Sequence, residues 1–273
     1  MIKQAIIPMA GLGTRLLPLT SVIPKELLPI NGKPGLEYIL DECIDAGIKE
    51  IILIISKRKK IIKKYFYNDL LFNKLIKIKK KDKNIKFQYS KIKKYKKIIK
   101  FVYQNSPNGT GNAILKCKSI IKSKYFLLLL PDDLIIKSNC SLSMIKLHKK
   151  YRASIIASIK VKKDNVSRWG IFDVKKINKS NFFIKDVIEK PKIKNAPSNY
   201  AVIGRYILSK KIFNILKSQK AGQNGEIHIT DAIRKMIHLN NKFVGHIFTG
   251  KYLDCGTMKG YINSFIEMKK HKS

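Results

Sequence analysis

The residues after the first apolar segment of the chain have the types needed to hold a polyphosphate. Residues 10–29 read AGLGTRLLPLTSVIPKELLP and directly follow the apolar run at 5–8. Glycines allow a backbone to approach a ligand closely and to point its N–H groups at it. Arg15 and Lys25 add two cations to the same loop. A strand followed by a glycine-rich turn and basic residues predicts a phosphate-binding site, although such a turn can also be only a turn.

The spacing of this loop excludes two common phosphate-binding motifs. A dinucleotide-binding loop requires a third glycine, and Leu16 stands at that position. A P-loop ends in Gly-Lys-Ser/Thr, which the segment lacks. The remaining interpretation is a nucleoside triphosphate held by backbone groups, Arg15 and Lys25.

Acidic residues follow a second apolar run. Asp132 and Asp133 come after Tyr125–Leu130 and Pro131, and open α/β sheets bind ligands at the carboxyl ends of their strands. Two carboxylates there suit Mg²⁺, which binds carboxylate and phosphate oxygens together. An Asp-rich turn is the alternative. Asp254 could supply another carboxylate, although an Asp before a helix is usually a cap.

Two further strand ends carry polar side chains. Glu189 can accept hydrogen bonds from sugar hydroxyls, and Lys190 can neutralise a phosphate, but a charged β-turn is an equal alternative. Gln104 offers the donor and the acceptor that a uracil edge requires, or is an ordinary edge residue. The five histidines show no metal-binding spacing, and no Ser-His-Asp order suggests covalent catalysis.

Alternating strand and helix patterns predict an α/β fold with a Rossmann-like mixed, mostly parallel sheet flanked by helices. We expect one domain over residues 1–273, with a lysine-rich insertion at about 57–100 that includes a helical segment near 69–72. A hairpin is expected around 169–173, and a second glycine loop at 105–111 opens a helix. The expected strands are 3–8, 50–55, 101–104, 125–130, 154–161, 182–188, 200–208 and 243–248, and the expected helices are 34–46, 230–239 with Thr230 as N-cap, and 256–269.

The net charge of +39 would ordinarily suggest nucleic acid. However, only six of the 57 basic residues are arginines, whose planar fork suits base edges and phosphates best. The abundance of Lys, Ile and Asn is typical of A/T-rich codons. We therefore expect no specific nucleic-acid partner, with adventitious polyanion binding as a side effect of the charge.

Hydropathy and cysteine spacing also predict where in the cell the protein is found. No apolar run approaches the roughly 18 residues of a membrane helix, and no signal peptide precedes the first strand. The four cysteines are scattered, with no Cys-x-x-Cys pair. We expect reduced thiols, a cytoplasmic protein and no membrane partner.

These groups occur in the order of a known family. The chain resembles the bacterial sugar-1-phosphate nucleotidyltransferases, and most closely the UTP–glucose-1-phosphate uridylyltransferases, over nearly its whole length. Family-wide features are Gly-x-Gly-Thr-Arg, Pro-Lys and a strand-end Asp. More specific are IPKELLP at 23–29, APSNYAVIGRY at 196–206 and GEIHITDAI at 225–233. Inactive-looking paralogues lose the Thr-Arg pair, which this chain keeps as Thr14 and Arg15.

The resemblance implies a role for each site residue and a homodimer or tetramer. Arg15, Lys25 and Lys190 would be catalytic: the first two would hold the triphosphate, and Lys190 would meet the phosphate of glucose 1-phosphate. Asp132 would hold Mg²⁺, together with Asp254. The substrate-binding residues would be Ala10, Gly11, Gln104 and Gly109 at the uracil, Gly13 and Thr14 in the loop, and Gly170, Glu189 and Val202 at the glucose.

The expected reaction is in-line attack of glucose 1-phosphate on the α-phosphorus of UTP, which gives UDP-glucose and pyrophosphate. The nucleophile is already anionic, so no general base is required. Three alternatives remain open: another nucleotide or sugar, such as dTTP; a weakly active regulatory paralogue; and a basic nucleic-acid-binding protein.

Overall fold

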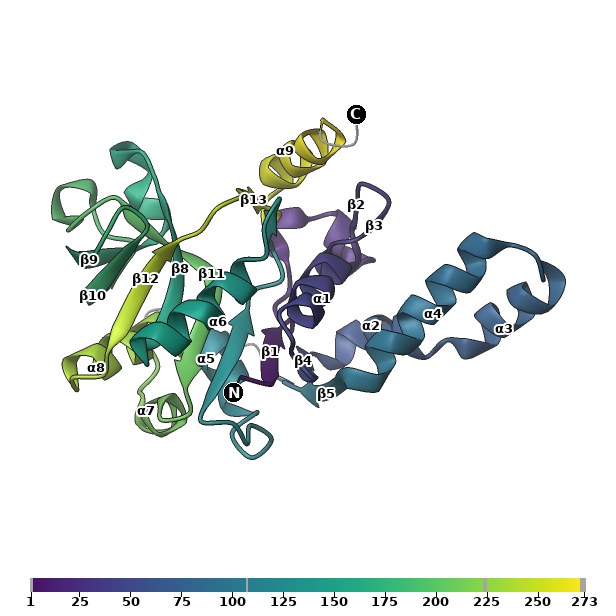
Figure 1. The fold of residues 1–273 in the computed structure, drawn as a ribbon, viewed down its shortest axis with the longest axis horizontal. Coiled ribbons are helices and arrows are strands. Elements are labelled where there is room, and N and C mark those ends of the chain that lie inside the picture. The colour runs from purple at the N-terminus through teal and green to yellow at the C-terminus, as the bar shows by residue number, and fades with distance from the viewer. Residues whose placement is uncertain (1, 107, 223–224, 271–273) are drawn as a thin grey trace.

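Apolar runs rich in Ile and Leu form the strands of the central sheet (Figure 1). In the computed structural model, which describes residues 2–106, 108–222 and 225–270, nine strands pair side by side. Their order across the sheet is β5 (Ile99–Tyr103), β4 (Glu50–Ile55), β1 (Gln4–Pro8), β6 (Tyr125–Leu129), β11 (Tyr200–Ser209), β8 (Ser154–Lys160), β12 (Phe243–Ile247), β10 (Asn181–Glu189) and β9 (Gly170–Lys176). The predicted α/β fold with a central mixed sheet is confirmed, but the prediction that the sheet is mostly parallel is wrong, because among the described strands four of its eight neighbouring pairs are parallel and four are antiparallel.

Parallel and antiparallel pairing divide the sheet. Strands β5, β4, β1 and β6 pair in parallel, as do β8 and β12. Strand β11 is antiparallel to both β6 and β8, and β10 is antiparallel to β12 and β9. The predicted hairpin is the β9–β10 pair, since a short connection can join only antiparallel neighbours. The four parallel strands β5, β4, β1 and β6 form one half of the sheet, and the glycine loop follows the carboxyl end of β1 in this half.

Helices cover both faces of the sheet because successive strand residues point to opposite sides. In β6, Leu127 and Leu129 pack into one core, and Phe126 and Leu128 pack into the other. The first core is closed by α1 (Gly35–Asp45) and α6 (Cys140–Tyr151), and the second by α5 (Gly109–Leu115), α7 (Ile212–Ser218) and α8 (Ile229–His238).

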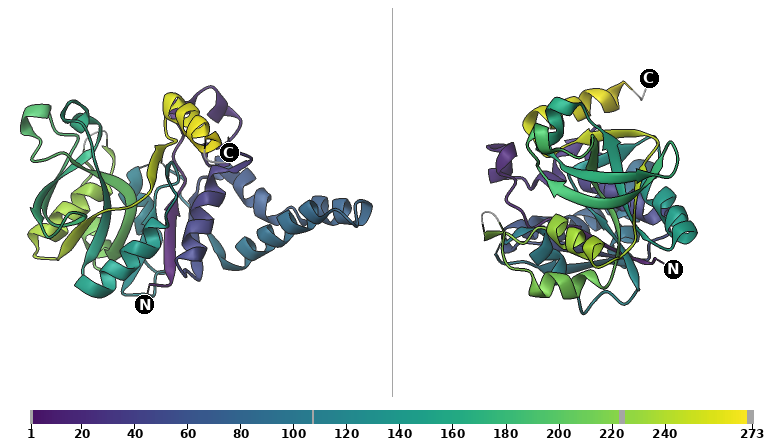
Figure 2. Two further views of the ribbon diagram at one scale, coloured as in Figure 1. Left: turned by 45° about the horizontal axis from the view of Figure 1, so that its top comes forward. Right: turned by 90° about the vertical axis from the view of Figure 1, so that its left-hand side faces the viewer.

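The lysine-rich insertion forms a helical arm, residues 57–98, that projects from the body beside β4 and β5 (Figures 1 and 2). It consists of a 3-10 turn (Lys57–Lys59), α2 (Lys60–Tyr67), α3 (Asp69–Ile78) and α4 (Lys83–Ile98). Polar contacts join the arm to α1: Lys91 Nζ lies 2.6 Å from Glu37 Oε2, and the Tyr95 hydroxyl donates to Asp41. The inner end of the arm is thereby tied to the body.

A small antiparallel sheet links the middle of the chain to its end. Strand β7 (Asp133–Ile136) pairs with β13 (Lys251–Asp254), so that Asp133 lies opposite Asp254. The chain then enters α9 (Met258–Lys269), whose cap is Thr257. Another two-stranded sheet, β2 (Pro29–Ile30) with β3 (Lys33–Pro34), precedes α1.

Two details of the sequence prediction need correction. Thr230 is not an N-cap, because it lies inside the first turn of α8, which His228 precedes as N-cap. The helices α6 and α7 and the strands β7 and β13 were not predicted. Part of the second glycine loop, residue 107, lies outside the described residues.

All four cysteines are free and buried. Among the described helices, none combines the length and the apolar character that a membrane span requires.

Lys59, at the base of the arm, forms a buried ion pair with Glu26 that allows a stability prediction. Its Nζ lies 2.8 and 2.9 Å from the two carboxylate oxygens, and the Glu26 side chain has no exposed surface. Lys59→Met would leave this carboxylate buried without its cation. We expect the free energy of unfolding to fall by about 3–5 kcal/mol in urea titrations. The exposed Lys57→Met is the control, and equal losses in both variants would contradict the prediction.

Candidate active site

A cavity of about 760 Å³ opens at the carboxyl ends of β1 and β6. Its lining comes from segments far apart in the sequence, from the glycine loop after β1 to the end of β13. Every residue that the sequence predicted to be catalytic, substrate-binding or metal-binding lines it: Ala10, Gly11, Gly13, Thr14, Arg15, Lys25, Gln104, Gly109, Asp132, Gly170, Glu189, Lys190, Val202 and Asp254.

The glycine loop leaves room for a ligand. A side chain at Gly11 would meet no atom within 4 Å, so the cavity reaches the backbone there. Gly13 has φ +75°, in the left-handed region that favours glycine, and its carbonyl accepts a 2.8 Å hydrogen bond from the Thr20 hydroxyl. The 3-10 turn at Thr14–Leu16 follows, and Arg15 points from it with 66% of its side chain exposed. This cation is therefore accessible to a phosphate.

Lys25 and Asp132 form the central ion pair of the cavity. Lys25 Nζ lies 2.6 Å from Asp132 Oδ2, and Arg15 approaches the same oxygen at 3.7 Å. Burial by itself would lower the pKa of Lys25, but the carboxylates of Asp132 and Glu26 outweigh it and raise that pKa. Burial would likewise raise the pKa of Asp132, and Lys25 lowers it instead. Both groups are charged at neutral pH.

Gln104 and Gly109 meet at another part of the cavity. The buried Gln104 amide donates to Asn112 Oδ1 at 3.1 Å and, more weakly, to the Gly109 carbonyl at 3.4 Å. Gly109 has φ +90°, and a Cβ there would lie 2.6 Å from the carbonyl oxygen of Ile227. Only glycine fits this position, because both the backbone angle and the neighbouring segment before α8 exclude a side chain.

The turn after β10 brings Glu189 and Lys190 to the cavity. Glu189 pairs with Gly170 across the hairpin, and a Cβ at Gly170 would lie 3.1 Å from Glu189 Oε2 and 3.0 Å from Val202 Cγ2. Lys190 has φ +44° and donates its backbone N–H to the Trp169 carbonyl at 3.0 Å. A carboxylate and a cation thus stand side by side at the cavity wall.

Asp254, the last residue of β13, also lines the cavity. Its Oδ1 accepts the backbone N–H of Gly256 at 2.9 Å, and Arg168 lies 3.9 Å from Oδ2. A Cβ at Gly256 would meet Asp132 Oδ2 at 2.8 Å, Arg15 at 3.0 Å and Asp254 Oδ1 at 3.2 Å. The glycine therefore leaves open a small space that both carboxylates face.

Such a space fits a hard divalent cation. Mg²⁺ is typically bound by one or two carboxylates and by substrate phosphates. Among the described residues, no group of three or more His, Cys, Asp or Glu could hold a metal by itself. A metal here would take its other ligands from a bound phosphate or from water, which is the arrangement of a substrate-dependent site.

Asp133 was predicted to suit Mg²⁺ together with Asp132, which stays a prediction, and both of its carboxylate oxygens accept hydrogen bonds from the protein. Its Oδ2 accepts the Gly204 N–H at 2.8 Å, and its Oδ1 accepts the Tyr252 hydroxyl at 2.7 Å. Burial and the charge of Asp132 raise the pKa of Asp133 to about 6. Asp133, the first residue of β7, therefore links β7 to β11 and β13.

A sequence model of the family described as "Nucleotidyl transferase" matches residues 4–271. The chain belongs to the nucleotidyl transferase family. This nucleotidyltransferase is 35% identical over 268 residues to the UTP–glucose-1-phosphate uridylyltransferase of Bacillus subtilis (strain 168). The aligned region covers 97% of this chain and 90% of the relative.

Solved structures agree with that relationship. The crystal structure of apo UDP-glucose pyrophosphorylase matches this nucleotidyltransferase with a TM-score of 0.91, at 35% identity over 100% of both chains. The complex of UDP-glucose pyrophosphorylase with UDP-glucose gives a TM-score of 0.86, at 35% identity over 99% of both chains. The predicted resemblance to the UTP–glucose-1-phosphate uridylyltransferases is confirmed.

The cavity of the nucleotidyltransferase also contains residues that the sequence did not single out. Glu26, His228 and Thr230 lie in the segments 23–29 and 225–233, so the motifs that carried the resemblance could have identified them. Arg168 and Tyr252 line the cavity outside these segments. Each lies two positions before a residue predicted to be in the site, Gly170 and Asp254, and that proximity in sequence could have identified them.

Proposed function

We propose that this nucleotidyltransferase transfers the uridylyl group of UTP to glucose 1-phosphate and releases pyrophosphate. The relatives named UTP–glucose-1-phosphate uridylyltransferase and the homologous complex with UDP-glucose support the substrates. The observation that carries the proposal is geometric. The residues expected at the nucleotide, at the sugar phosphate and at the metal all line one cavity, so two substrates can meet there.

The reaction exchanges one phosphorus–oxygen bond for another. A phosphate oxygen of glucose 1-phosphate forms a bond to the α-phosphorus of UTP, and the bond from that phosphorus to the bridging oxygen of the β-phosphate breaks. The bonding electrons leave with pyrophosphate. Because the attacking oxygen already carries negative charge, no side chain has to remove a proton. The protein must instead align two anions that repel each other.

The cations of the cavity suit this task. In the proposal, Lys25 and Arg15 hold the triphosphate and neutralise the departing pyrophosphate, while Lys190 binds the phosphate of glucose 1-phosphate. Glu189 would accept hydrogen bonds from the sugar, with Gly170 and Val202 shaping the pocket. Gln104 and Gly109 would hold the uracil beside Ala10 and Gly11, and Gly13 and Thr14 would complete the loop. Such preorganised charges act most strongly where charge develops in the transition state.

Mg²⁺ fits the space between Asp132 and Asp254, and when bound it would supply positive charge to the α-phosphate oxygens. In the structure the Asp132 carboxylate contacts Lys25, and that of Asp254 accepts the Gly256 N–H.

A pyrophosphate-release assay with UTP, Mg²⁺ and glucose 1-phosphate tests the proposal directly. We expect product only when all three are present, and a higher kcat/KM for UTP than for dTTP, CTP, ATP or GTP. A panel of hexose 1-phosphates tests the sugar in the same way. A preference for another nucleotide or sugar would support nucleotidyl transfer but contradict the proposed substrates. Absence of pyrophosphate release would contradict the proposed activity.

Gly256→Ala tests the space between the carboxylates. The added methyl group would stand 2.8 Å from Asp132 Oδ2 and 3.2 Å from Asp254 Oδ1, where the metal is proposed to bind. We expect a folded protein whose kcat falls about 10- to 100-fold, with a higher Mg²⁺ concentration needed for half-maximal rate. Gly222→Ala is a suitable control, because its Cβ would make only ordinary contacts of 3.6 Å or more. Equal rates in both variants would contradict the assignment.

Three expectations from the sequence stay predictions. Association into a homodimer or tetramer can be measured by light scattering of the purified protein, and the cytoplasmic location by fractionation of cells that make it. That residues 1–273 fold as one domain predicts a single cooperative unfolding transition.

A further inference from the structure

A buried ion pair lies directly behind the segment that carries Asp132. Arg205 of β11 donates from Nε and NH2 to the carboxylate of Glu42 in α1, over distances of 2.9–3.1 Å. The Arg205 side chain has no exposed surface, and that of Glu42 is 7% exposed. Neither residue lines the cavity, so the proposed reaction does not use them directly.

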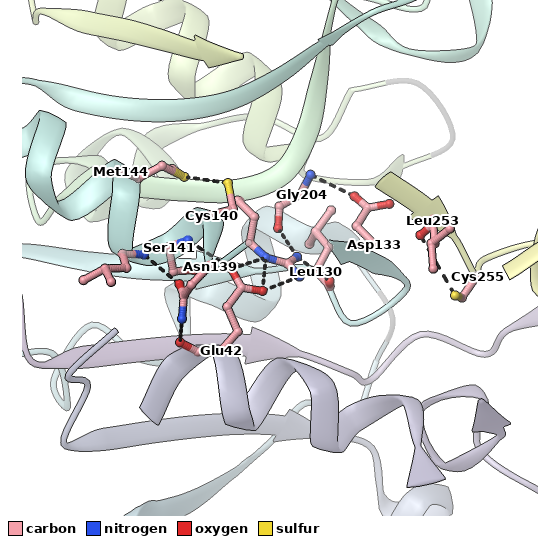
Figure 3. Close-up of polar contacts among 12 residues, drawn as sticks. Glu42, Leu130, Asp133, Asn139, Cys140, Ser141, Met144, Gly204, Leu253 and Cys255 are labelled. Carbon is pink, nitrogen blue, oxygen red and sulfur yellow. Dashed lines mark hydrogen bonds and ion pairs between the residues drawn. The ribbon is translucent and has the colours of Figure 1, made fainter. Parts of the chain in front are cut away.

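Arg205 also holds the strand end that leads to Asp132. Its NH1 donates to the carbonyl of Leu130 at 3.2 Å and to that of Gly204 at 2.9 Å. The Leu130 N–H donates back to the Gly204 carbonyl at 2.8 Å, so the two backbones are joined next to the guanidinium (Figure 3). The Leu130 carbonyl, two residues before Asp132, is the acceptor on this strand end to which Arg205 donates.

Glu42 fixes the other side of the guanidinium. Its Oε1 accepts from the Ser141 N–H at 3.1 Å and from the Ser141 hydroxyl at 2.5 Å, at the start of α6 (Figure 3). Asn139 Nδ2 donates to the Glu42 backbone carbonyl at 3.0 Å. The carboxylate is thus held by both β11 and α6, and it cannot turn without breaking several hydrogen bonds.

A buried ion pair of this kind adds little to the stability of a fold. The free-energy cost of removing two charges from water is often as large as the gain from their attraction. Apolar residues of similar volume often stabilise a fold equally well. Charges buried with all their hydrogen bonds satisfied instead fix the positions of the groups they hold. Here the group held is the carbonyl two residues before the proposed metal ligand.

We propose that Arg205 and Glu42 are positioning residues for Asp132. They hold the Leu130 carbonyl so that the following loop presents the Asp132 carboxylate to Lys25 and to the space beside Gly256. This inference rests on the proposed function for the meaning of that carboxylate. It predicts that loss of the pair weakens metal binding and turnover far more than it weakens the fold.

The main test replaces both charges at once. Glu42→Met with Arg205→Met fills the volume with apolar atoms and leaves no unpaired charge. We expect a Tm within a few degrees of the parent, about 10- to 100-fold weaker binding of Mn²⁺, and a comparable fall in kcat with little change in KM for UTP. Mn²⁺ binding is measured by electron paramagnetic resonance, with the ion alone and with UDP-glucose added.

A matched control removes another ion pair of the same sheet. Lys100 Nζ lies 2.6 Å from Glu50 Oε2, far from the cavity at the amino ends of β4 and β5. Glu50→Gln with Lys100→Met is expected to keep Mn²⁺ affinity and kcat. Arg205→Lys provides a milder test, because a single ammonium group can pair with Glu42 but lacks the fork that also reaches the Leu130 carbonyl.

The outcomes separate this inference from the proposed function. If the parent protein makes no UDP-glucose, the function fails, and Mn²⁺ binding alone still tests the positioning role. A folded double variant with unchanged Mn²⁺ affinity and unchanged kcat overturns the inference. If the double variant does not fold, Arg205→Lys decides: weaker Mn²⁺ binding at nearly unchanged Tm supports the positioning role, and either parental affinity or failure to fold overturns it in favour of a purely structural pair.

Discussion

Lys190→Ala is expected to lower kcat about 10²- to 10³-fold while the Tm stays within a few degrees of the parent. The side chain is exposed, and in the structure its backbone N–H, not its ammonium group, bonds to Trp169, so little packing is lost. In the proposed reaction this cation offsets the charge of the attacking phosphate, most strongly in the transition state. Initial rates of pyrophosphate release at saturating UTP and glucose 1-phosphate measure the effect.

Lys192→Ala is the matched control for Lys190→Ala. Lys192 is also exposed and lies two residues further along the same loop, but it does not line the cavity. Its removal lowers the net charge by the same amount, so a general electrostatic effect would appear in both variants. A parental kcat in Lys190→Ala, or equal losses in both, would count against the assignment.

Asp132→Asn should reduce Mg²⁺-dependent turnover by about 10³-fold. The amide keeps the shape of the side chain but removes the negative charge that Lys25 and Arg15 approach at 2.6 and 3.7 Å. Without that charge, a divalent cation would lose one of its two proposed protein ligands, and Lys25 loses a carboxylate that raises its pKa. Rates measured over a range of Mg²⁺ concentrations separate loss of metal affinity from loss of the chemical step.

Asp45→Asn, at the exposed end of α1, is the control for Asp132→Asn. It removes the same charge far from the cavity and should leave the rate and its Mg²⁺ dependence unchanged. If Asp132→Asn kept the parental response to Mg²⁺, Asp132 would not be a metal ligand.

Local sequence was sufficient for the parts of the site that stand at strand ends. Gly13 requires a positive φ, and Asp132 follows an apolar strand, so both features could be read from neighbouring residues. The parallel half of the sheet followed from the same alternation of apolar runs and helices. Because the carboxyl ends of parallel strands meet at one edge, residues after β1 and β6 had to lie close together.

Contacts between distant residues could not be predicted in this way. Lys25 and Asp132 are 107 positions apart, and nothing near either one indicates a 2.6 Å ion pair. Asp133 has the same local surroundings as Asp132, but its oxygens bond to Gly204 and Tyr252 from other strands. The helix α6 was missed although Asn139 caps it, because its serines and basic residues weaken the apolar periodicity.

The Lys25–Asp132 pair also has a consequence for how ligands enter. In this structure the two charges already neutralise each other, with only 17% and 18% of their side chains exposed. In the proposed reaction, Asp132 exchanges Lys25 for the metal cation, and Lys25 exchanges Asp132 for a phosphate. Because both side chains are already largely buried, little water has to be removed from them when the ligands bind. At this pair, ligand binding is then an exchange of partners, in which a metal at Asp132 frees Lys25 for a phosphate and a phosphate at Lys25 frees Asp132 for a metal.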